Sequence, residues 1–133
     1  MRQKFKRSYD EIKSIVTMTE TFFQRERLHS GLRNVVDLAT EELFVNMETY
    51  NIESNKDILI EMAPHEHGIE VSLTDFDVER FDPTRVRTVN VDAPVDERTP
   101  GGLGLYLVLK MVDSIHYEYR NRQSRITFVV DRN

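Results

Sequence analysis

Hydrophobic residues in the first half of the chain recur at helical spacing. Between Asp10 and Leu28 the apolar side chains fall at intervals of three and four, and the same spacing returns over residues 30–51. Asp10 is a residue type that caps helix N-termini. The pattern therefore predicts two amphipathic helices, preceded by a short edge strand over residues 4–9.

The period changes to two in the next segment. Apolar and polar residues alternate over 58–62 and again over 69–74, on either side of a turn at residues 65–68. A second alternating pair, over 114–119 and 126–130, ends the chain. This alternation indicates two β-hairpins, each with one buried face.

A polar loop and a third helix separate the two hairpins. Residues 75–100 carry three prolines and many charges, and a loop of this length in a compact domain is usually functional. An apolar, helically periodic segment follows from Leu103 to Val112. This order of elements predicts an α+β fold, a two-layer α/β sandwich with a mixed, mostly antiparallel sheet covered on one face by three helices.

Composition narrows the class of protein. A chain of 133 residues with 39% hydrophobic and 31% charged residues is expected to form one domain over residues 1–133. The absence of cysteine excludes disulfides and thiolate metal sites, and together with the lack of a secretory leader favours the cytoplasm. A net charge of -5 argues against direct nucleic-acid binding, and no apolar run is long enough to span a membrane.

Three of the five glycines fall within four residues, Gly101, Gly102 and Gly104, where the third predicted helix begins. A glycine-rich turn that opens a helix suits phosphate, because the backbone can approach closely and free N–H groups point at the ligand. The alternative is a hinge before an ordinary amphipathic helix.

The second predicted helix carries a polar stripe of Glu42, Asn46 and Tyr50 at successive intervals of four. A carboxylate and an amide oxygen one turn apart suit Mg²⁺, and a carboxylate beside that ion could act as a general base. The alternative is a solvated stripe on the outer face of the helix.

Three segments together resemble the ATP-binding domain of the GHKL superfamily, the Bergerat fold. Within it, they resemble the anti-sigma-factor serine kinases. The first is the helix segment from Glu42 to Tyr50, the second runs from Thr74 to Pro83, and the third from Gly101 to Leu105. The similarity spans residues 31–130.

The resemblance implies a role for each matching residue. Glu42 would be the general base, Asn46 would bind Mg²⁺, and Asp75 would accept a hydrogen bond from the adenine amino group. The remaining positions that the resemblance assigns to nucleotide binding are Tyr50, Asp77, Phe81, Gly101, Gly102, Leu103, Gly104 and Leu105.

Two positions depart from the family pattern. Asp77 stands where the family has a glycine that lets the backbone approach the adenine, and Ser124 stands near the place of an asparagine in the last hairpin. Asp77 therefore opens the question of whether ATP binds.

The resemblance implies a serine/threonine protein kinase that binds Mg-ATP. Its substrate would be a serine on a STAS-type anti-sigma antagonist, within a partner-switching system. A sigma factor is a further partner that the resemblance suggests, and a homodimer is expected. The alternatives are an inactive module that sequesters a sigma factor or another regulator, and the catalytic domain of a sensor histidine kinase.

Histidines offer a weaker indication of chemistry. His65 and His67 flank Glu66 in the first hairpin turn, where solvent exposure is expected rather than metal binding. His29 and His116 have no partner that the sequence reveals.

Overall fold

The computed structural model describes residues 1–50, 54–80 and 102–131. The strands are β1 (Arg2–Phe5), β2 (Ile58–His65), β3 (Gly68–Phe76), β4 (Ser114–Arg120) and β5 (Gln123–Asp131). The helices are α1 (Ile12–Glu26), α2 (Arg33–Tyr50) and α3 (Gly102–Met111), with short 3₁₀ turns at Tyr9–Glu11 and Ser30–Leu32.

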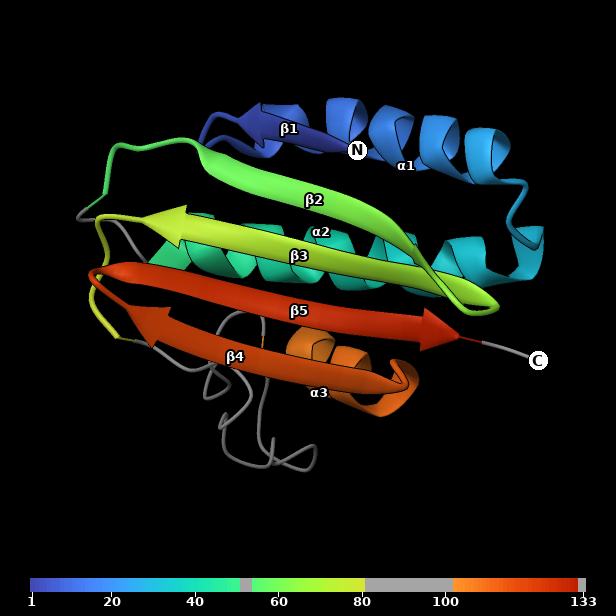
Figure 1. Cartoon of the computed structure of the whole chain (residues 1–133). Coiled ribbons are helices and arrows are strands. Elements are labelled where there is room, and N and C mark those ends of the chain that lie inside the picture. The colour runs from blue at the N-terminus through green and yellow to red at the C-terminus, as the bar shows by residue number, and fades with distance from the viewer. Residues whose placement is uncertain (51–53, 81–101, 132–133) are drawn as a thin grey trace.

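The strands form one sheet in the order β1-β2-β3-β5-β4, and the helices lie together on one face of it (Figure 1). Each neighbouring pair of described strands runs antiparallel. The predicted two-layer α+β sandwich is therefore confirmed, and all the pairings seen in the described ranges are of the antiparallel kind.

The hydrophobic core fills the space between the sheet and the helices. Leu43 and Phe44 of α2 are fully buried, as are Ile60 of β2 and Phe128 of β5. Burying a side chain of this size stabilises a fold by about 1.5–3 kcal/mol. These residues fix the rotation of α2 about its axis, which decides where its polar side chains lie.

The first strand is shorter than the sequence pattern predicts, ending at Phe5 rather than Tyr9. The Ser8 amide donates to the Lys6 carbonyl at 2.8 Å, and the Ser8 hydroxyl accepts from the Asp10 amide at 3.2 Å. Ser8, not Asp10, is therefore the first capping residue, because its side chain offers the backbone an alternative to the strand ladder. The turn leaves Arg7 partly buried.

The boundary between the first two helices also differs from the prediction. Helix α1 ends at Glu26, because Arg27 adopts a left-handed conformation with φ 53°. The His29 ring then caps the next turn, its Nδ1 accepting from the Gly31 amide at 3.0 Å. In the described ranges, no helix combines the length and apolar character that crossing a membrane requires.

Candidate functional site

The polar stripe of α2 lies at the edge of the core. Glu42 and Asn46 are both half-buried, and they alternate with the buried Leu43, Phe44 and Met47. Tyr50 is the last residue of α2, and only its backbone is described. The stripe is therefore not a fully solvated face.

Glu42 lies against the first turn of α3. A Cβ atom added to Gly104 would overlap the Glu42 carboxylate, so this close approach requires glycine. Gly102 and Leu103 belong to the same helical turn, whereas Gly101 lies outside the described residues. The structure thus brings together two segments that are far apart in sequence, the α2 stripe and the glycine-rich turn.

The environment of Glu42 makes its carboxylate more basic. Burial raises the pKa of Glu42 above its ordinary value of 4.5, and the nearby negative charge of Glu41 raises it further. Within the described part of the chain, no hydrogen bond or ion pair offsets this effect at Glu42. A carboxylate in this environment is suited to accepting a proton.

Asp75 lies near the end of β3, opposite Ser124 of β5 in the sheet register, and its side chain is fully buried. Arg7 binds it with both ends of the guanidinium: Nη1 to Oδ1 at 2.5 Å and Nη2 to Oδ2 at 2.9 Å. Arg7 Nη2 also approaches the Met47 carbonyl of α2 at 3.4 Å. A paired geometry of this kind is the strong form of an arginine–carboxylate contact.

Sequence reasoning did not identify Arg7 as a residue of this site. The two partners are separated by 68 positions, and Arg7 belongs to a basic run of ordinary appearance. The one available signal was the need of a buried aspartate for a compensating partner, which does not say which residue supplies it.

Asp77 keeps the backbone conformation that suits a glycine. Its φ is 58°, in the left-handed region that aspartate tolerates better than most residues. Arg122 Nε donates to Asp77 Oδ1 at 3.0 Å, and both side chains are more than half exposed. The charge that Asp77 adds is thus compensated at the surface.

The turn that follows β3 is tied to the second hairpin. The Val78 amide donates to the Arg122 carbonyl at 3.0 Å, and the Tyr119 hydroxyl donates to the Val78 carbonyl at 2.8 Å. These contacts hold the end of β3, where Asp75 lies. Of the other predicted positions, Leu105 is buried in the core and Phe81 lies outside the described residues.

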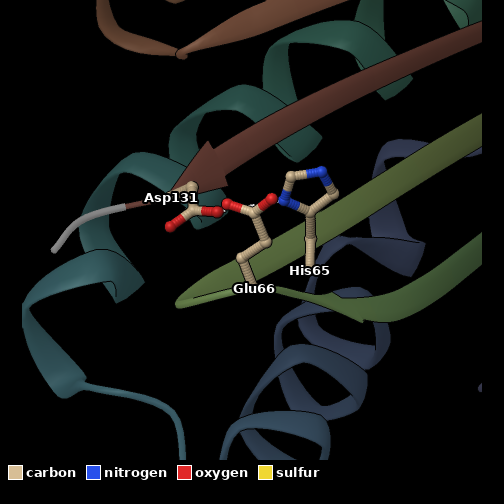
Figure 2. Close-up of side chains that lie close together, drawn as sticks. All are labelled: His65, Glu66 and Asp131. Carbon is tan, nitrogen blue, oxygen red and sulfur yellow. Dashed lines mark hydrogen bonds and ion pairs between the residues drawn. The ribbon is translucent and has the colours of Figure 1, made fainter.

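A separate polar cluster lies at the opposite end of β3 (Figure 2). His65 Nδ1 lies 3.0 Å from Asp131 Oδ2, and the ligand atoms of His65, Glu66 and Asp131 all fall within 4.8 Å of one another. Asp131 Oδ1 also accepts from the His67 amide at 3.3 Å. These contacts join the β2–β3 turn to the end of β5.

The exposure expected for this turn is found at His67, and the side chain of His65, 39% exposed, also contacts Asp131. His29 caps a turn, and His116 lies 3.4 Å from Glu118 on the exposed face of β4. Local side-chain partners of this kind depend on strand register and turn geometry, which the sequence leaves open.

We expect the His65 ring to titrate above its ordinary pKa of 6.5, chiefly because of its hydrogen bond to Asp131. Because the folded-state pKa is raised, the pair stabilises the fold fully below pH 6.5 and loses this effect as pH rises through the folded pKa. NMR titration of the ring measures the shift. Asp131→Asn should remove most of it and Glu66→Gln only a small part, and equal effects of the two would contradict the assignment.

Similarity to a known protein family extends over both the α2 stripe and the glycine-rich turn. The family model described as histidine kinase-like ATPase domain matches residues 5–130, which include both α2 and the glycine-rich turn. No curated protein matches the chain.

Proposed function

The chain belongs to the histidine kinase-like ATPase domain family, and from this premise we propose that it is a Mg-ATP-dependent serine/threonine protein kinase of the anti-sigma-factor type. Its substrate would be a serine of a STAS-type antagonist in a partner-switching system. The observation that carries the proposal is the close approach of the Glu42 carboxylate to Gly104, because the proposal takes Glu42 as the base and the turn at Gly104 as the phosphate site.

The described residues fit a Mg-nucleotide. Asn46 lies one helical turn from Glu42, and its half-buried amide offers the kind of oxygen that Mg²⁺ prefers. The first turn of α3 provides backbone N–H groups and a close approach at Gly104. Asp77 retains a glycine-like backbone at the point where the family pattern has glycine. When bound, Mg²⁺ would offset phosphate charge.

Glu42 would act on the hydroxyl of the substrate serine. Its carboxylate takes the hydroxyl proton while the serine oxygen forms a bond to the γ-phosphorus. The bond between that phosphorus and the β–γ bridging oxygen breaks, and ADP leaves. The raised pKa of Glu42 favours this proton transfer, since a more basic carboxylate is a stronger acceptor.

Calorimetric titration with ATP, with and without Mg²⁺, tests the nucleotide site. We expect Mg-dependent binding to the unmodified protein and loss of the Mg²⁺ dependence in Asn46→Ala. Asn34→Ala is the matched control, because Asn34 is an exposed asparagine on the same helix. Mg-ATP affinity that is unchanged in Asn46→Ala would refute the ligand role of Asn46.

A second function is favoured by the ion pair between Arg7 and Asp75. Because Arg7 binds both oxygens of the residue assigned to the adenine, the chain could be a binding module that sequesters a sigma factor or another regulator. No binding at millimolar ATP, with or without Mg²⁺, would favour this function, and co-purification of a regulator in the absence of nucleotide would support it.

A further inference from the structure

Asp75 is reached by a side chain from a distant part of the chain. Its carboxylate has no solvent exposure, whereas the Arg7 side chain bound to it is 11% exposed. Arg7 comes from the turn after β1, and its guanidinium binds both carboxylate oxygens. Of the two paired side chains, Arg7 is therefore the one that faces solvent.

The guanidinium and an adenine amino group present the same chemistry to a carboxylate. Each is a planar nitrogen group that donates N–H bonds, and the guanidinium adds a full positive charge. Because the Asp75 carboxylate has no solvent exposure with Arg7 bound, a base that donates to it exchanges with an existing charge-assisted bond. A bond of this kind is stronger than one between neutral groups.

We propose that Arg7 is an affinity- and specificity-determining residue of the nucleotide site, because it competes with the base for Asp75. A nucleotide reaches the Asp75 carboxylate by displacing the Arg7 guanidinium. The apparent affinity for the nucleotide is then the intrinsic affinity multiplied by the fraction of molecules in which Arg7 does not occupy Asp75. The inference rests on the proposed binding of ATP at Asp75.

The local structure allows the exchange without unfolding the sheet. Pairing of β1 with β2 ends at Phe5 and Ile58, so Arg7 lies beyond the ladder. The turn that carries it is held by the short bond from the Ser8 amide to the Lys6 carbonyl, which does not involve the Arg7 side chain. The 3.4 Å contact of Nη2 with the Met47 carbonyl is long for a hydrogen bond. Release of the Arg7 guanidinium from Asp75 therefore leaves the pairing of β1 with β2 in place.

The test compares ATP with inosine triphosphate, whose base carries a carbonyl in place of the amino group. We expect Arg7→Ala to bind ATP at least about tenfold more tightly, the equivalent of one charge-assisted hydrogen bond. The gain for inosine triphosphate should be smaller, because its base has no amino group for Asp75. Arg7→Lys should fall between, since lysine keeps the charge but lacks the paired donors.

The matched control is Arg33→Ala, which removes the ion pair that Arg33 forms with Asp37 on α2. This substitution should change neither the affinity for ATP nor the affinity for inosine triphosphate. Far-ultraviolet circular dichroism establishes that each variant is folded, and Arg7→Lys carries the test if Arg7→Ala is not.

Two outcomes separate this inference from the proposed function. If the unmodified protein and the Arg7 variants bind ATP equally, or the variants bind it less tightly, competition is excluded while nucleotide binding stands. If neither the unmodified protein nor Arg7→Ala binds ATP at millimolar concentration, nucleotide binding at Asp75 fails and the competition fails with it.

Discussion

Replacing Glu42 with glutamine is expected to lower the rate of phosphoryl transfer by about 10²- to 10⁴-fold, the usual contribution of a positioned general base. Glutamine keeps the size of the side chain beside Gly104 but cannot accept the serine proton. ATP affinity should change little, since the resemblance assigns nucleotide contacts to other residues. Single-turnover transfer of labelled γ-phosphate to a serine-bearing antagonist protein measures the rate.

Glu41→Gln is the matched control for this prediction. Glu41 directly precedes Glu42 on α2, so the control makes the same substitution one residue away. The Glu41 carboxylate lies 3.5 Å from the Tyr9 hydroxyl. Because Glu41 raises the pKa of Glu42, its loss should move the acid limb of the pH–rate profile to lower pH and leave the plateau rate within a few fold. Equal transfer by Glu42→Gln and the unmodified protein would refute the assignment of the base.

The sequence predicted those parts of the site that follow from periodicity. The stripe of Glu42 and Asn46 follows from the 3.6-residue period, which fixes the side of α2 that faces the core. Asp75, by contrast, is assigned by the resemblance alone, and the alternation places it at the start of the loop, whereas the structure places it, buried, within β3. What the sequence could not supply was the contact between Glu42 and Gly104, because this depends on how α2 and α3 pack against each other on one face of the sheet.

Arg7 and Asp77 show two further limits of sequence reasoning. A contact over 68 positions leaves no local pattern, so the partner of Asp75 could not be inferred. Asp77 was identified as a departure because a side chain replaces a glycine, but its φ of 58° and its bond to Arg122 are properties of the folded turn. Asp77 thus replaces the glycine of the family pattern but keeps a backbone conformation that suits glycine.

Replacing Gly104 with alanine is expected to abolish most phosphoryl transfer while the fold keeps its stability. The added Cβ overlaps the Glu42 carboxylate, which lies at the end of a flexible side chain and moves aside in preference to the helix backbone. Alanine is also favoured over glycine inside a helix by about 1 kcal/mol. Transfer should therefore fall by a factor on the order of 10²–10⁴, as for Glu42→Gln, because the base is displaced.

Gly31→Ala is the control, because it makes the same glycine-to-alanine change away from the candidate site. A Cβ at Gly31 would meet the His29 ring, with Nδ1 at 2.8 Å and Cε1 at 2.9 Å, so this alanine also displaces a side chain. His29 belongs to the turn before α2 and not to the candidate site, so transfer should be unchanged. Thermal melting and single-turnover transfer are measured on both variants. Full transfer by Gly104→Ala would mean that the contact with α3 does not position the base. A large drop in its melting temperature would mean that the backbone of α3, rather than Glu42, gives way.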